Sequence, residues 1–189
     1  MTRLLKDLPI PVAVLLAVLM MPPEWSIHLG GLRLSGYRVV LLLLFVPMLY
    51  RLLTSPKLRV SPADAGMMFV SVWCFLALAA NHDLIAAIEK SGILIAEIFG
   101  SFLLARIYIT SYQQLVAVAR FLVVLIAFVL IVSVPESLSG VHFLRGSDIT
   151  IYPERMGLHR AYGPFDHPIL HGVYCAAAFS YVYYLVART

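Results

Sequence analysis

The residues best suited to chemistry lie in one polar stretch, 136–167, near the end of the chain. Its arginines Arg145, Arg155 and Arg160 could bind an anion, because a guanidinium offers two parallel charge-assisted hydrogen bonds and stays protonated. A loop longer than about 12–15 residues is usually functional or disordered, and the aromatic residues of this one argue against disorder. The stretch also carries Asp148 and Glu154, together with His159, Asp166 and His167, which could in principle act as a base.

A second polar group lies inside an apolar segment. Lys90, Glu97 and Ser101 are spaced by seven and four residues, so on a helix of 3.6 residues per turn they form one stripe. A carboxylate at mid-membrane is unfavourable unless it is paired or hydrated, so Glu97 is expected to face the bundle interior or a cavity. Two interpretations stay open: Lys90 reaches Glu97 as a structural ion pair, or these residues line a cavity.

Two histidines, His167 and His171, are four residues apart at the start of the last apolar segment. Such a pair can bind zinc, but zinc sites use three or four protein ligands and the spacing places no third one here. We therefore expect no metal and no cofactor. The sequence instead predicts a helix that starts at Pro168 and is capped by Asp166 or His167, with an imidazole at the membrane interface.

The elements that carry these residues are membrane helices. Apolar residues make up 61% of 189 positions and charged residues 13%, against about 25% charged in a soluble domain. A helix that spans a bilayer needs about 20 mostly apolar residues. The sequence therefore predicts an all-α, polytopic transmembrane bundle that forms one domain over 1–189. About six helices are expected: Leu5–Met21, Tyr37–Leu53, Ala63–Ala80, Leu84–Ile109, Leu115–Val134 and Pro168–Ala187.

Basic residues set the predicted orientation. The net charge of +4 comes from residues scattered at the ends of apolar segments, which indicates topology determinants and not a nucleic-acid surface. Most of them mark one side as cytoplasmic, with both termini inside: Arg3, Lys6, Arg51, Lys57, Arg59, Arg106, Arg120 and Arg188. The loop 136–167 is then extracytoplasmic. Arg33 and Arg38 lie on that same side, which indicates interfacial anchoring or an anionic ligand.

One segment carries a family motif: Arg160-Ala-Tyr-Gly163-Pro-Phe165-Asp-His-Pro168-Ile-Leu-His-Gly172. It leads from the polar loop into the last helix. It resembles the signature of the O-antigen ligase and O-antigen polymerase superfamily, which are bacterial envelope polysaccharide enzymes. That signature is an Arg, then Gly-x-Phe, then a Pro that leads a helix, then a Gly.

A second segment, Glu97-Ile-Phe-Gly-Ser-Phe-Leu-Leu-Ala-Arg106, is similar to the family helix that ends in Leu-Leu-Ala-Arg before a cytoplasmic turn. The resemblance covers Ser91 to Gly172 with motifs and the rest of the chain by hydropathy. Ile169 follows Pro168 where the family more often has Asn, which leaves open the branch of the superfamily.

The resemblance implies transfer of a glycan from a polyprenyl-pyrophosphate donor to an acceptor at the outer face of the bacterial inner membrane. Arg160 is then expected to bind the pyrophosphate and to stabilise its developing charge, which needs no metal. Arg155 and Arg145 are further candidates by location. The remaining motif residues are expected to shape the turn and the helix start: Gly163, Phe165, Pro168 and Gly172.

The family also implies about twice as many helices, and a large periplasmic loop further along with the acceptor site and base. The chain is therefore expected to be the N-terminal half of such an enzyme, with its general base unassigned, and a second polypeptide could complete the bundle. Two other interpretations stay open. One is a small transporter or accessory subunit in which Glu97 and Lys90 line a permeation path, and the other is an inactive truncated product.

Overall fold

The computed structural model describes residues 6–29, 32–55, 58, 60–146, 149 and 152–187, with the backbone alone at 28, 29, 32 and 33. Some residues used above therefore lie outside the described residues: Arg3, Leu5, Lys57, Arg59, Asp148 and Arg188. The side chain of Arg33 is outside them as well.

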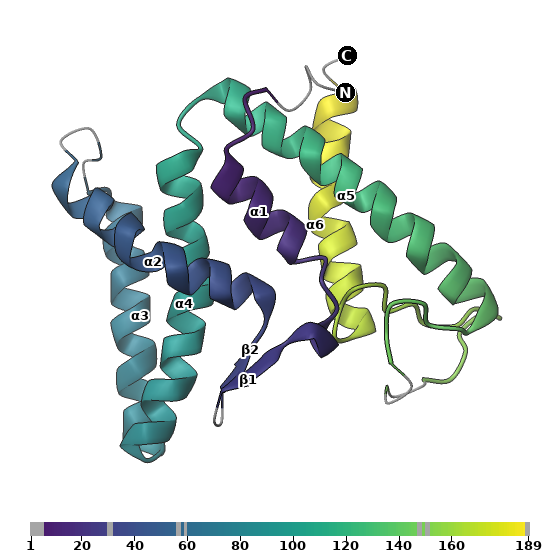
Figure 1. Ribbon diagram of the computed structural model, residues 1–189, viewed down its shortest axis with the longest axis horizontal. Helices are drawn as coiled ribbons and strands as arrows, with labels where there is room; N and C mark the ends of the chain where they lie inside the picture. Colours follow the sequence, from purple (N-terminus) through teal and green to yellow (C-terminus); the bar gives the residue numbers. More distant parts are fainter. Residues whose placement is uncertain are drawn as a thin grey trace. The chain divides into compact units, whose positions relative to one another are not determined.

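The regular secondary structure of the described chain is helical apart from one short hairpin (Figure 1), which confirms the predicted all-α class. Its α-helices are α1 (Ile10–Val18), α2 (Gly36–Thr54), α3 (Pro62–Asn81), α4 (Leu84–Tyr108), α5 (Tyr112–Ser139) and α6 (Pro168–Val186). A short 3-10 helix, η1 (Pro23–Trp25), leads into the antiparallel strands β1 (Ile27–Leu29) and β2 (Leu32–Leu34).

Five helices, α2 to α6, are long and apolar enough to cross a membrane, so the chain is a multi-pass membrane protein. The helix α1 has nine residues, which span roughly 14 Å at 1.5 Å per residue and thus about half of the hydrocarbon core. The predicted span from Leu5 to Met21 is therefore helical only over Ile10–Val18 in the described chain. Pro9 and Pro11 explain the late start, because proline is tolerated in the first turn of a helix but not in its interior.

Most of the long helices begin where the sequence offers a polar cap. Ser61 and Asp64 form a capping box before α3, and a second capping box begins α5. Asp83 caps α4 and His167 caps α6. These caps satisfy backbone N–H groups that have no partner within the helix. The observed ends of α2, α3, α4 and α6 agree with the predicted ends to within one residue.

The end of α5 differs from the prediction. The apolar pattern predicted an end at Val134 and a loop from Glu136, but the helix continues through Pro135 to Ser139. Proline is tolerated in a membrane helix where neighbouring groups satisfy the freed backbone atoms. The helix stops where Gly140 adopts the left-handed conformation with φ +70°. The polar loop therefore begins at Gly140, and Glu136 belongs to the helix.

The described residues divide into two compact units. One unit is 27–110, and the other combines the flanking parts of the chain, up to Ser26 and from Ser111. In the unit 27–110, α4 packs against both α2 and α3 (Figure 1). A Cβ added at Gly100 would lie 3.5 Å from Leu41 and Phe45, so α4 approaches α2 closely at this glycine.

The other unit packs α5 against α6 and α1. Its buried core consists of Met20, Leu125 and Val129. Partly buried side chains from the three helices and the polar loop surround this core: Leu16, Leu19, Phe121, Phe165, Tyr174 and Cys175. The motif residue Phe165 thus anchors the polar loop in the helix core.

The outward faces of the helices are apolar. Phe69 and Trp73 are exposed on α3, and Val173 and Phe179 are exposed on α6. Water would solvate such a continuous apolar surface poorly, whereas lipid chains cover it readily. The long helices therefore contact membrane lipid.

An ion pair links α3 to α4. Asp64 is fully buried, and its carboxylate lies 3.3 Å from the Nε of Arg106 while also accepting the backbone N–H of Ser61. We expect Asp64→Ala to lower the thermal midpoint in detergent by roughly 4–8 °C, because about 2 kcal/mol is lost with the cap and the buried pair.

The matched control is Asp83→Ala. Asp83 is an exposed cap of α4 that accepts the N–H of Ala86 at 3.2 Å. Its loss should lower the midpoint by roughly 2–4 °C or less, since an exposed cap contributes about 1 kcal/mol. Equal midpoints for the two variants would contradict the role assigned to the buried pair.

Candidate functional site

Glu136 ties the polar loop to the end of α5. Its side chain is fully buried. One carboxylate oxygen accepts the backbone N–H of Phe143 at 3.1 Å. The other accepts the N–H groups of Tyr162 and Gly163 at 3.0 and 2.8 Å. Three donors converging on two oxygens suit a carboxylate, which only accepts hydrogen bonds when ionised.

This carboxylate lies in the last turn of α5, where the helix dipole disfavours negative charge. The backbone donors of the loop offset that unfavourable position. The Nδ1 atom of His142 also lies 3.6 Å from Glu136, beyond hydrogen-bond length, with only 10% of its side chain exposed. Glu136 was missed by the sequence analysis because the apolar segment was taken to end at Val134, which placed Glu136 in the loop. Its spacing from Val129 and Ser133, by seven and three residues, places it on their helix face and could have revealed it.

Further contacts hold the backbone on both sides of Arg160. The Ser137 hydroxyl donates to the carbonyl of His159 at 2.9 Å, and the His159 N–H donates to the carbonyl of Ser137 at 2.9 Å. On the other side, the carbonyl of Ala161 lies 3.1 Å from Nδ1 of the buried His171, whose Nε2 is 3.3 Å from the hydroxyl of Ser133. The segment 159–163 is therefore fixed against α5 and α6.

The guanidinium of Arg160 lies over the ring of Tyr152, 5.0 Å from its centroid. The Tyr152 hydroxyl is 2.8 Å from Nε2 of His167, and Nδ1 of His167 accepts the N–H of Ile169. Because Nδ1 accepts, a neutral His167 carries its proton on Nε2 and donates to Tyr152. Among the described residues no carboxylate pairs with Arg160, which is half-buried.

Arg145 has a different environment, because two carboxylates neutralise it. Its side chain is 8% exposed, and it pairs with Glu24 at 2.8 Å and with Asp166 at 3.4 Å. It also donates to the carbonyl of Phe165 at 3.1 Å and lies over the ring of Tyr162. These contacts give Arg145 a role in holding the loop together.

Arg155, the third candidate, lies on an exposed turn. Its backbone pairs with Leu158 in an isolated bridge. Met156 and Gly157 between them have positive φ values of 54° and 77°. Within the described chain, no contact joins the side chain of Arg155 to Arg160 or Arg145. The structure therefore does not bring the three predicted arginines together as one cluster.

Tyr162 is close enough to Arg145 and Arg160 for both charges to act on its phenol. Burial raises the pKa of its phenol above the ordinary value, and the nearby Tyr152 raises it further. The positive charges of Arg145 and Arg160 act in the opposite direction. The pKa remains raised, so Tyr162 stays neutral at physiological pH and does not compensate either arginine.

The other motif residues shape this arrangement. Gly163 has φ +55° and donates its N–H to Glu136. The ring of Phe165 lies 5.0 Å from that of Tyr174 in the core, and Pro168 begins α6. A Cβ added at Gly172 would meet nothing within 4 Å, so the packing described here does not explain that glycine.

Two glycines of this region should respond differently to alanine. A Cβ at Gly140 would lie 2.9 Å from the ring of His159, whereas one at Gly163 would lie 3.6 Å from Ser133. Both positions have positive φ, which costs an alanine about 1–2 kcal/mol. Gly140→Ala also requires the ring of His159 to shift, so we expect its thermal midpoint to fall further than that of Gly163→Ala. Similar midpoints, measured in one detergent, would contradict the close packing of His159.

Within the membrane region, Glu97 pairs with Arg38 and not with Lys90. The Nε of Arg38 lies 2.6 Å from Glu97, and the Tyr37 hydroxyl donates to the same oxygen at 2.8 Å. Lys90 is exposed, and no contact in the described chain joins it to Glu97. Of the two interpretations left open by the sequence, the ion pair between Lys90 and Glu97 is therefore not the one that the structure has. The cation that pairs with Glu97 comes instead from α2, because α2 packs against α4 at this position.

His167 and His171 have separate environments. The ring nitrogens of His167 contact Ile169 and Tyr152, and those of His171 contact Ala161 and Ser133. In the part of the chain that the structure describes, no three His, Cys, Asp or Glu residues are placed to hold a metal. The histidines therefore act as hydrogen-bonding groups of the loop and of α6, including the cap that the sequence predicted.

Comparisons with known proteins add no relative. No protein-family model, curated protein or solved structure matches this chain. Function is therefore argued from the motif residues and from the geometry of the loop.

Proposed function

We propose that this membrane protein is a glycan ligase or polymerase of the O-antigen ligase type. Its donor is a glycan on a polyprenyl pyrophosphate, and transfer occurs at the outer face of the bacterial inner membrane. The N-terminus is cytoplasmic in this proposal, because most basic residues then lie inside and the polar loop lies outside. The support comes from the motif that runs from Arg160 to Gly172 and from the setting of Arg160.

The observation that carries the proposal is the contrast between Arg145 and Arg160. Arg145 is balanced by Glu24 and Asp166. Arg160 instead rests on an aromatic ring, and its backbone neighbours are held by α5 and α6. A positioned guanidinium that pairs with no carboxylate of the described residues suits a phosphate ligand, since it can form two parallel hydrogen bonds without first breaking any ion pair that the structure describes.

In the proposed reaction the hydroxyl oxygen of the acceptor bonds to the anomeric carbon of the donor glycan. The bond between that carbon and the pyrophosphate oxygen breaks, and its electron pair leaves with the polyprenyl pyrophosphate. The hydroxyl proton passes to a base that we do not assign. Arg160 stabilises the negative charge that develops on the leaving group, which lowers the barrier because the charge grows toward the transition state.

The residues around Arg160 act as positioning residues. Glu136 holds the N–H groups of Tyr162 and Gly163, and His167 holds the hydroxyl of Tyr152 beneath the guanidinium. Preorganisation of this kind matters, because a binding group that must reorganise loses part of its effect on the transition state. Arg155 is exposed and is proposed only as a secondary contact.

A binding experiment tests the proposal. The protein, in nanodiscs of zwitterionic lipid, is titrated with radiolabelled polyprenyl pyrophosphate and, separately, with polyprenyl monophosphate. We expect at least about fivefold tighter binding of the pyrophosphate, since one further interfacial charge contributes about 1 kcal/mol. Equal affinities would count against a pyrophosphate site.

The contacts of Glu97 bear on the transporter alternative. Its carboxylate is bound by Arg38 and Tyr37 from the neighbouring helix, which suits a link between α2 and α4. Under our proposal Glu97→Gln reduces the stability of the helix pair and leaves the preference for pyrophosphate unchanged. Loss of that preference in Glu97→Gln would favour a path through the unit 27–110.

A further inference from the structure

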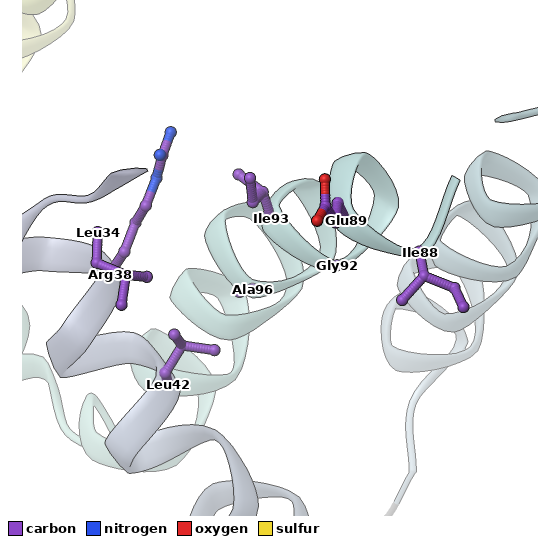
Figure 2. Close-up of a pocket in the computed structure, with 8 residues that line it drawn as sticks. All are labelled: Leu34, Arg38, Leu42, Ile88, Glu89, Gly92, Ile93 and Ala96. Carbon is purple, nitrogen blue, oxygen red and sulfur yellow. The ribbon is translucent and has the colours of Figure 1, made fainter. Parts of the chain in front are cut away.

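An apolar groove opens between the N-terminal parts of α2 and α4, within the unit 27–110 (Figure 2). Its volume is about 260 Å³, slightly below the range of about 300–1,000 Å³ for small-molecule sites. Leu42 of α2 and Gly92, Ile93 and Ala96 of α4 supply apolar walls. A water molecule inside it would find few polar partners, so an apolar occupant is favoured.

The groove narrows toward the membrane interior. At Gly100 an added Cβ would contact Leu41 and Phe45 at 3.5 Å, whereas at Gly92 it would meet nothing within 4 Å. These two glycines are eight residues apart, which is roughly 12 Å along a helix. The helices α2 and α4 therefore approach each other closely at Gly100, whereas the space beside Gly92 is open.

The wide end of the groove opens toward the side of the membrane on which α2 and α4 begin, and it carries charge. Arg38 is in the first turn of α2, a helix of 19 residues that needs its full length to cross a bilayer of about 20 residues. The single crossing by α3 returns the chain, so α4 starts at the same surface as α2. Glu89, in the second turn of α4, is exposed, and in Figure 2 it extends to the same side of the groove as Arg38.

The charge of this rim is unequal. Glu97 already balances Arg38 across 2.6 Å, so the carboxylate of Glu89 adds negative charge at the mouth of the groove. Lys90, the next residue, does not line the groove. The rim therefore favours a ligand that brings a cation to Glu89 and can place an anion near Arg38.

We propose that the groove binds one acyl chain of a bilayer phospholipid whose head group carries a primary ammonium, as in phosphatidylethanolamine. The chain lies along Leu42 and Ala96, the phosphate lies on the Arg38 side, and the ammonium pairs with Glu89. The apolar walls alone would not select a lipid, because lipid chains are as apolar as the side chains that they contact. Selectivity comes from the head group, since a primary ammonium donates hydrogen bonds to a carboxylate and a quaternary one cannot.

Photo-crosslinking tests the site. The protein is reconstituted in phosphatidylcholine vesicles in which about one lipid in twenty is a probe. The probe is a phosphatidylethanolamine with a diazirine in one acyl chain. Labelled residues are located by mass spectrometry. We expect the label on the groove residues of α2 and α4 at least about tenfold above that on α3, and label spread evenly over the exposed faces would overturn the proposal.

A pair of glycine variants separates the groove from general lipid contact. Gly92 and Gly66 both have open space around an added Cβ, so Gly92→Leu and Gly66→Leu should both fold, which monodisperse elution in detergent verifies. Only Gly92 lines the groove. We expect Gly92→Leu to reduce labelling of the groove at least about tenfold and Gly66→Leu to leave it unchanged. Labelling that persists in a folded Gly92→Leu would overturn the site.

The head-group claim has its own control. Unlabelled phosphatidylethanolamine should compete with the probe about fivefold better than phosphatidylglycerol does. One interfacial charge contributes about 1 kcal/mol, which corresponds to this ratio of affinities. Glu89→Gln should abolish this preference, and Lys90→Gln should preserve it because Lys90 lies outside the groove. A preference that survives Glu89→Gln would overturn the assignment of Glu89.

Discussion

Replacement of Glu136 by alanine is expected to lower the free energy of unfolding by about 3 kcal/mol or more, the largest effect on stability that this fold predicts for one side chain. The substitution leaves the N–H groups of Phe143, Tyr162 and Gly163 without their acceptor. Each buried orphan group costs about 1–3 kcal/mol. The thermal midpoint in detergent should fall by roughly 6–12 °C.

Two variants show whether the effect belongs to this carboxylate. Glu154 lies on the exposed part of the same loop, 3.3 Å from His159, and Glu154→Ala should shift the midpoint by no more than roughly 2 °C. Glu136→Gln keeps the shape but places an amide donor among backbone donors, so its midpoint should fall between those of wild type and Glu136→Ala. A midpoint for Glu136→Ala equal to that of Glu154→Ala would rule out the proposed anchoring.

Arg160→Ala is expected to weaken the binding of polyprenyl pyrophosphate by about 10- to 100-fold, the loss that corresponds to roughly 1.5–3 kcal/mol for charge-assisted hydrogen bonds. The thermal midpoint should stay close to that of wild type, because the described contact of the guanidinium is with the ring of Tyr152. Binding is measured by the nanodisc titration and folding by the thermal midpoint. Arg160→Lys should recover only part of the affinity, since an ammonium cannot form the paired hydrogen bonds.

The neighbouring arginines serve as matched controls. Arg155→Ala, on an exposed turn, should change the affinity by less than about threefold, as expected for one screened surface charge. Arg145→Ala should instead lower the thermal midpoint, because it leaves the carboxylates of Glu24 and Asp166 without their partner. If Arg155→Ala weakened binding as much as Arg160→Ala, the effect would reflect the general charge of the loop and not a positioned site.

The helices were predictable because two independent signals agree in the sequence. Long apolar runs require membrane spans, and polar residues before their starts supply the caps, as at Ser61 and His167. These signals are local in the sequence, so they can be recognised without knowing which helices pack together. The same local logic failed at Pro135, because a helix in a membrane can continue through proline when its surroundings satisfy the freed groups.

The partners of the charged residues were not predictable in the same way. Spacing placed Lys90 and Glu97 on one stripe, but the cation that pairs with Glu97 comes from α2, through Arg38. Likewise, sequence position made Arg145 a further candidate for anion binding and did not reveal the carboxylates that neutralise it. The pairing of Arg145 with Glu24, more than a hundred residues earlier in the chain, depends on the packing of α1 and α5. Long-range pairing of this kind follows from tertiary structure, which periodicity does not encode.

Glycan transfer itself tests the central claim most directly. Membrane vesicles that contain the protein, expressed from its complete reading frame, are supplied with a glycan on polyprenyl pyrophosphate and with an acceptor, and acceptor-linked glycan is measured together with released polyprenyl pyrophosphate. We predict that both products appear in equal amounts, and that Arg160→Ala lowers their rate by about 10²–10³-fold at an unchanged protein level. Equal rates for wild type and Arg160→Ala, or the absence of transfer by folded wild-type protein, would contradict the account.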